Sequence, residues 1–213
     1  MKNVFLIVSS LFFVPTLPAQ KKVSCIIKTE LGNITIELYP AKAPVTVANF
    51  LKYVDAHLYD SSFFFRAVTL NNQPKDSVKI EVIQGGDVDS LKKFAPIPLE
   101  STKQTGLLHK NGTISMARGK PSTATSSFFI CINDQPSLDF GGKRNRDGQG
   151  FAAFGKVTKG IDVEKKFNSF ILSRGNILNR EYQFYTSSEN RSHKKLPVFL
   201  FLVLIKYNSL QQI

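Results

Sequence analysis

Short apolar runs separated by turn-forming segments constrain the fold of this 213-residue chain most strongly. Gly, Pro, Asn or Asp stand between most of the runs, as is typical of strands joined by turns. The runs, rich in β-branched and aromatic residues, lie at 23–28, 34–38, 61–68, 80–83, 114–117, 128–132, 151–157 and 196–207. The pattern predicts about eight strands, and spaced strands with few helices favour a closed β-barrel.

Two segments follow the helical period instead. Residues 45–59 carry apolar side chains at spacings of four, three and four, as on one face of an amphipathic helix, and Pro44 suits its first turn. Residues 158–170 predict a second helix, because Asp162 and Glu164 would lie near its positive end. We therefore expect a mainly β domain with two α-helices.

The first 20 residues predict a signal peptide rather than part of the fold. Lys2 precedes an apolar run at 4–14, and small or polar residues then lead to Ala19. The run is too short to span a bilayer, and a buried N-terminal strand is the alternative. We therefore expect an exported protein, periplasmic or secreted, with a single domain over residues 21–213.

The formal net charge of +12 permits binding to nucleic acid or to an anionic surface. The basic residues are scattered, however, and no nucleic-acid motif accompanies them, so a solvated basic surface is the favoured interpretation. The apolar run at 196–207 is also too short to cross a membrane and reads better as a final strand. We expect no nucleic-acid partner and no membrane span, and a basic surface-binding protein stays a third hypothesis.

Metal and cofactor chemistry find no support in the sequence. The three His residues have no metal-ligand spacing with the two cysteines, and no phosphate-binding or dinucleotide motif is present. Cys25 and Cys131 stand in apolar runs, which favours two buried thiols over one disulfide bridge. His109 lies in a loop and is interpreted as a structural hydrogen-bonding residue. No cofactor and no metal are expected.

One cation stands out among the apolar runs. Arg66 follows three Phe residues, and on spacing alone a salt bridge or a snorkelling side chain explains it. Residues 111–132 form a strand–loop–strand unit whose loop is rich in hydroxyl groups, and long loops of this kind are often functional. With the downstream run at 150–157, these pieces predict one apolar site with a fixed cation.

The motifs FFFRAV, VIQGGD, GTISMARGKPSTATSSFFICI and FAAFGKV occur in this order. They resemble those of the cyclophilins, the cyclophilin-type peptidyl-prolyl cis-trans isomerases, and most of all the compact exported bacterial members. The resemblance covers roughly residues 23–167. It implies a closed eight-stranded antiparallel β-barrel capped by two α-helices, with a substrate groove on its outside.

The resemblance also implies the site. The family's catalytic arginine falls on Arg66 and its supporting glutamine on Gln84. The substrate-binding positions implied in the same way are Val82, Ala117, Arg118, Gly119, Ser127, Phe129, Leu138 and Phe151. The implied substrates are proline-containing polypeptides, and we expect a monomer that assists the folding of exported proteins.

The chain departs from the family pattern in places. Ser127 replaces a glutamine, Ser137 replaces a tryptophan, and Glu81–Val82 replaces a Phe-Met pair. Phe151 stands where the family has a histidine, after an inserted GKRNRDGQ segment, and the loop at 69–79 is longer than usual. The alternative is therefore a catalytically weak or inactive module that binds proline peptides on the same barrel.

Overall fold

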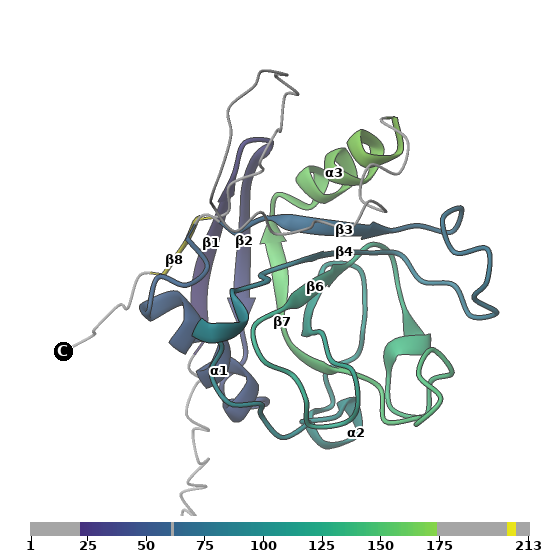
Figure 1. Ribbon diagram of the computed structural model, residues 1–213, viewed down its shortest axis with the longest axis horizontal. Coiled ribbons are helices and arrows are strands. Elements are labelled where there is room, and N and C mark those ends of the chain that lie inside the picture. Colours follow the sequence, from purple (N-terminus) through teal and green to yellow (C-terminus); the bar gives the residue numbers. More distant parts are fainter. Residues whose placement is uncertain (1–21, 61, 174–203, 208–213) are drawn as a thin grey trace, which may run out of the picture.

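The computed structural model describes residues 22–60, 62–173 and 204–207. One curled antiparallel sheet contains eight strands in the order β3-β4-β6-β5-β7-β2-β1-β8 (Figure 1). The strands are β1 (Val23–Thr29), β2 (Gly32–Leu38), β3 (Phe64–Val68), β4 (Val82–Gly85), β5 (Thr113–Met116), β6 (Phe128–Cys131), β7 (Ala152–Lys159) and β8 (Leu204–Tyr207). The predicted signal peptide and the first part of the last predicted run lie outside the described residues.

The prediction of a closed barrel is wrong. Seven strands between Val23 and Lys159 curl into a half-barrel, and the short β8 extends its β1 edge. β3 and β8 are the two edges of the sheet, and no pairing joins them in the described part of the chain. Helix α3 (Ile161–Ser173) instead contacts β2, β3 and β4. Its Phe167 packs on Phe64 with ring centroids 5.1 Å apart. A helix thus packs against the edge strand β3, which a closed barrel would pair with another strand.

Both predicted helices are present, with shifted ends. Helix α1 (Pro44–Asp55) begins at the proline and ends earlier than predicted, before His57, whose φ is 56°. Helix α3 begins later than predicted, because β7 continues to Lys159 and Gly160 then turns the chain with a φ of 85°. A positive φ interrupts helical hydrogen bonding, which explains both differences.

Short helices also occur in segments between the strands for which no helix was predicted. Helix α2 (Thr102–Thr105) starts with a capping box between Ser101 and Gln104 and ends at Gly106, which has a φ of 71°. Two 3₁₀ turns, η1 (Ser90–Lys92) and η2 (Pro136–Leu138), complete the described elements. These pieces are too short for a periodic apolar pattern.

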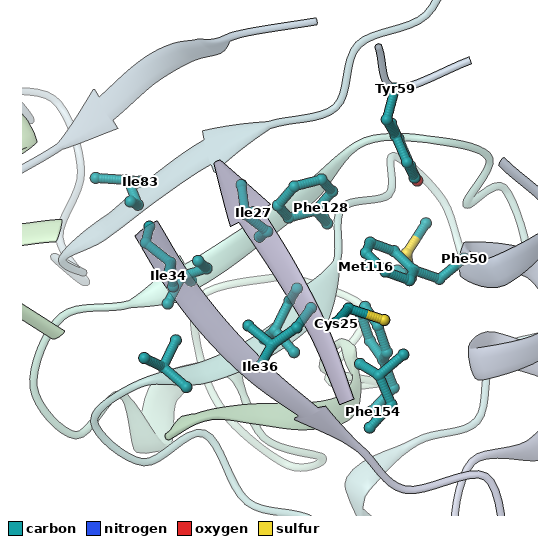
Figure 2. Close-up of a cluster of buried hydrophobic side chains, with 14 of the residues drawn as sticks. Cys25, Ile27, Ile34, Ile36, Phe50, Tyr59, Ile83, Met116, Phe128 and Phe154 are labelled. Atoms are coloured by element: carbon teal, nitrogen blue, oxygen red, sulfur yellow. The ribbon is translucent and has the colours of Figure 1, made fainter. Parts of the chain in front are cut away.

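The inner face of the curled sheet holds the main core. Alternate residues of β1 and β2, such as Cys25, Ile27 and Ile36, point into it and are fully buried (Figure 2). Phe50 of α1 completes this core, with its ring centroid 5.6 Å from that of Phe128. Burial raises the pKa of the Cys25 thiol to about 12.

Cys25 and Cys131 are both buried, as predicted. They lie on opposite sides of the sheet. Cys25 belongs to the inner core, whereas Cys131 belongs to a separate apolar cluster on the outer face. A disulfide between them is therefore excluded by position.

The second glycine of the Gly85–Gly86 pair, directly after β4, marks a close approach of the backbone to the core. Gly86 has a φ of 73°, and a Cβ atom placed there would lie 2.6 Å from the Phe128 ring. The turn thus brings the backbone directly onto the inner core.

Gly86→Ala is expected to lower the free energy of unfolding by about 2–4 kcal/mol, since a left-handed alanine and a core clash both contribute. Gly106→Ala is the matched control, because Gly106 also has a positive φ but an added Cβ would have nothing within 4 Å. Urea unfolding should show a loss of only about 1–2 kcal/mol for the control. Equal losses in the two variants would contradict the close approach.

Candidate functional site

Three residues implied as site residues form one row across the sheet. Arg66 of β3 lies opposite Gln84 of β4, which lies opposite Phe129 of β6. Directly opposed residues on neighbouring strands point to the same face, here the outer one. With strands about 4.8 Å apart, the row spans roughly 10 Å between its outer Cα positions.

A β-bulge places Arg66 in this row. The register shifts between Phe64 and Arg66, so that Phe65 is the extra residue on β3. Phe64 is consequently buried on the inner side, whereas Arg66 is exposed on the outer side. Bulges often redirect a side chain beside a functional site, and this one turns the cation outward from a run of three phenylalanines.

Arg66 is weakly restrained. Its Nη1 donates to Gln84 Oε1 across 3.4 Å, a long hydrogen bond. Partial desolvation lowers the pKa of the Arg66 guanidinium, the nearby Arg144 cation lowers it further, and Asp76 opposes both effects. Arginine stays charged under such shifts, so the group remains a planar cationic donor, and within the described residues it makes this one hydrogen bond.

An apolar cluster lies beside Arg66 on the outer face. We call this set the outer cluster. Its buried members are Val68, Ile80, Val82, Phe129, Cys131 and Leu138, with the partly buried Ala117 and Phe151 packed against them. The Phe151 ring meets the Phe129 ring edge-on, with centroids 5.3 Å apart. The structure thus gathers all five apolar residues of the implied site in one cluster: Val82, Ala117, Phe129, Leu138 and Phe151.

His109 supports the outer cluster from below. Its ring stacks on Phe129 with centroids 5.9 Å apart, and the residue is only 1% exposed. Nδ1 lies 2.7 Å from Asp139 Oδ1 and Nε2 lies 3.0 Å from Ser115 Oγ. A carboxylate can only accept, so Nδ1 donates the proton and the ring orientation is held at both nitrogens. The structural interpretation of His109 is confirmed.

Arg118 clamps the loop that precedes β7. Nη1 and Nη2 donate to the two Asp147 carboxylate oxygens at 2.8 and 2.9 Å, and Nε donates to Gly150 O. The guanidinium also lies 5.1 Å from the centroid of Phe151. This bidentate pair fixes the loop, and with it the ring that borders the outer cluster.

The remaining implied residues lie beside the clamp. Ser127 O accepts a hydrogen bond from Ala117 N at 2.8 Å, and Gly119 N donates to Thr123 Oγ1. The Arg118 side chain is committed to the loop, so only its backbone remains for a ligand. The sequence reasoning missed Asp147 as its partner, and the one available signal was the acidic residue within the inserted GKRNRDGQ segment.

The clamp predicts an acid-sensitive part of the stability. Hydrogen bonds from Arg118 lower the pKa of Asp147 below its usual value of 3.8. A carboxylate with a lowered folded-state pKa adds stability above its unfolded pKa, and this is lost as the pH falls through the folded-state value. Urea unfolding should therefore show that the stability difference between wild type and Asp147→Asn shrinks from pH 5 to pH 3. A difference that is constant with pH would contradict the clamp.

The described residues hold no group of three or more His, Cys, Asp or Glu side chains that could bind a metal ion. Within the same residues, no helix has the length and apolar character needed to cross a membrane.

Known proteins with similar sequences are peptidyl-prolyl cis-trans isomerases. The family model "cyclophilin type peptidyl-prolyl cis-trans isomerase/CLD" matches residues 24–185. A peptidyl-prolyl cis-trans isomerase of Acinetobacter baylyi is 39% identical over 142 residues, covering 65% of this chain and 68% of the relative. Peptidyl-prolyl cis-trans isomerase A of Dickeya dadantii is 36% identical over 159 residues, covering 73% and 76%.

Solved structures agree on the fold. A cyclophilin-type isomerase of Cryptosporidium parvum superposes with a TM-score of 0.58 at 21% identity, covering 89% of this chain and 99% of its own. A second structure of that protein, determined in the presence of the dipeptide Ala-Pro, gives a TM-score of 0.57. The family match covers more than half of the chain and runs from the second residue of β1 past the end of β7. The chain therefore belongs to the cyclophilin-type peptidyl-prolyl cis-trans isomerase family.

Proposed function

We propose that this isomerase acts through Arg66, oriented by Gln84, on X-Pro bonds whose proline ring rests on the outer cluster. The observation that carries the proposal is the row of Arg66, Gln84 and Phe129 across three adjacent strands. It places a cationic donor and an apolar surface on one face, about two strand spacings apart.

The reaction breaks no covalent bond. Resonance keeps an X-Pro amide planar, with a rotation barrier of about 20 kcal/mol. As the bond twists, the prolyl nitrogen regains its lone pair and becomes a hydrogen-bond acceptor. A donor such as the Arg66 guanidinium can bind that lone pair only in the twisted state, so the contact stabilises the transition state and not the ground state.

The ring must be held while the amide rotates. Phe151 and Ala117, the partly buried members of the outer cluster, are the surfaces that a proline ring can reach. Val82, Phe129 and Leu138 lie beneath them and are at least 95% buried. Burying an apolar ring against this set favours binding and excludes water from the amide.

The backbone at Arg118 would hold the substrate chain. In the part of the chain that the structure describes, no intramolecular hydrogen bond occupies the N–H or C=O group of Arg118. An extended peptide could pair with both groups, as in strand-like peptide recognition. Gly119 and Ser127 flank this position and would border the bound chain.

A protease-coupled assay with an Ala-Pro peptide tests the function. We expect the wild-type protein to accelerate cis-trans exchange well above the uncatalysed rate, which has a time constant of tens to hundreds of seconds. The Cryptosporidium relative was studied with Ala-Pro, which supports this probe. No acceleration at micromolar protein would defeat the proposal.

The inactive binding module is the second candidate. The departures at Ser127, Ser137 and Glu81 favour it. The Glu81 carboxylate, however, accepts a hydrogen bond from Asn133 and not from a residue of the row. Binding of the Ala-Pro peptide without exchange broadening of its NMR signals would favour the module. Broadening that scales with enzyme concentration favours the isomerase.

The cellular role follows from the segment at 1–20. A monomeric isomerase directed out of the cytoplasm would assist the folding of exported proteins whose folding is limited by proline isomerisation. Fractionation of cells that express the full chain would test export. Refolding of a proline-limited substrate protein would test the assistance, and an unchanged refolding rate would contradict it.

A further inference from the structure

Two loops meet beside Arg66. One joins β3 to β4, and the other joins β6 to β7 and contains the inserted GKRNRDGQ segment; Figure 1 shows both beyond the same side of the sheet. Arg144 of the second loop connects them. Its Nη1 donates to Val78 O at 2.6 Å and lies 3.2 Å from Asp76 Oδ2. Both loops depart from the family pattern, and neither contact takes part in the proposed mechanism.

The two partners differ in how firmly they are held. The Arg144 side chain is 14% exposed and bonded to a backbone carbonyl, whereas the Asp76 side chain is 47% exposed. Asp76 makes one further contact, a backbone hydrogen bond to Gln73 O. The carboxylate is therefore the partner that is free to move if the pair is broken.

Both charges act on Arg66. The Arg144 cation and the Asp76 anion shift the pKa of Arg66 in opposite directions, so both lie within electrostatic range. Yet Arg66 forms no ion pair with Asp76 or with any other carboxylate in the described residues. The carboxylate of this loop that acts on the Arg66 guanidinium is thus paired with another arginine.

We propose that Arg144 is a positioning residue: it holds the Asp76 carboxylate away from Arg66 and so keeps the Arg66 guanidinium free for the prolyl nitrogen. The inference rests on the proposed catalytic role of Arg66. In this proposal Arg144 and Arg66 compete for the Asp76 carboxylate.

The size of the effect follows from the fraction of Arg66 that Asp76 captures once Arg144 is removed. An exposed ion pair is worth up to about 1 kcal/mol, which would leave roughly one fifth of the Arg66 groups free. Since only the free fraction is competent, kcat/KM should fall about five-fold.

A double-mutant cycle on the full chain, with the Ala-Pro peptide as probe, tests this. Arg144→Gln should lower kcat/KM about five-fold. Asp76→Asn should retain wild-type activity, because a neutral amide cannot capture Arg66. The double variant should return to the wild-type value. Arg144→Lys, which keeps the charge, should lose less than Arg144→Gln.

Salt supplies a second readout. An exposed Arg66–Asp76 pair is screened by salt, so about 0.5 M NaCl should restore part of the Arg144→Gln activity relative to wild type. A loss caused only by a disordered loop would not respond in this way. Urea unfolding of each variant is the control, and each variant should unfold in a transition like that of the wild type.

The outcomes separate the two proposals. Full activity of Arg144→Gln, or a double variant as impaired as Arg144→Gln, would overturn the positioning role while leaving Arg66 in place. Unchanged activity in Arg66→Ala would overturn the catalytic proposal itself. Rescue by Asp76→Asn together with inactivity of Arg66→Ala would support both.

Discussion

Arg66→Ala is expected to lower kcat/KM for the Ala-Pro peptide by about 100-fold. Removing one donor that acts in the transition state commonly costs 10²–10³ in rate, and Arg66 is the only cation in the row across β3, β4 and β6. The free energy of unfolding should stay within about 0.5 kcal/mol of wild type, because the side chain is exposed and makes one long hydrogen bond. Substitution of Arg66 would therefore lower the activity while leaving the stability nearly unchanged.

Matched variants show whether activity depends on the positive charge of Arg66 or on the planar arrangement of its N–H donors. Arg66→Lys keeps the charge but loses the planar set of donors, so it should retain only part of the activity. Gln84→Leu should have a smaller effect than Arg66→Ala, because it removes the rotamer support but leaves the donor. Arg146→Ala is the control, since Arg146 is an exposed arginine outside the row. A normal rate in Arg66→Ala would remove the basis of the mechanism.

The resemblance implied the candidate site residues, and strand alternation explains why they share one face of the sheet. The side-chain period of a strand is two, so adjacent phenylalanines must face opposite sides of the sheet. Phe128 and Phe129 do so, one in the inner core and the other in the outer cluster. The motif order then placed Arg66 and Gln84 on the strands that pair beside them.

The bulge and the sheet closure could not be predicted in the same way. A bulge adds one residue without changing the apolar composition of the run, so FFFR reads alike with or without it. Closure depends on whether the last strand can reach β3 across space already covered by α3, and a strand pattern contains no information on that distance. Counting eight strands was correct, but the count does not imply a closed barrel.

The charged contacts of the loops were missed for a related reason. The residues Arg118 and Asp147 are 29 positions apart, and His109 and Asp139 are 30 apart. No periodicity connects loop residues across such separations, and turn-forming aspartates look alike whether or not they have partners. Only the folded loops reveal that these side chains hold the ring of Phe151 and the ring of Phe129.

The adjacent residues Phe128 and Phe129 offer the sharpest separation of fold from function. Each is at most 5% exposed, so alanine at either position should lower the free energy of unfolding by about 3–5 kcal/mol. Only Phe129→Ala should also impair catalysis, by about 30-fold in kcat/KM per folded molecule, since loss of the ring that supports Phe151 would remove about 2 kcal/mol of binding to the proline ring.

Phe128→Ala removes an equal ring from the inner core, where its neighbours are Phe50 and Tyr59, and leaves the outer cluster intact. Its kcat/KM per folded molecule should therefore match wild type, with the folded fraction taken from urea titration. If either alanine variant is mostly unfolded, Phe128→Leu and Phe129→Leu can be compared in the same way. Equal losses of activity at the two positions would mean that the outer cluster does not hold the proline ring, because packing alone would then account for both variants.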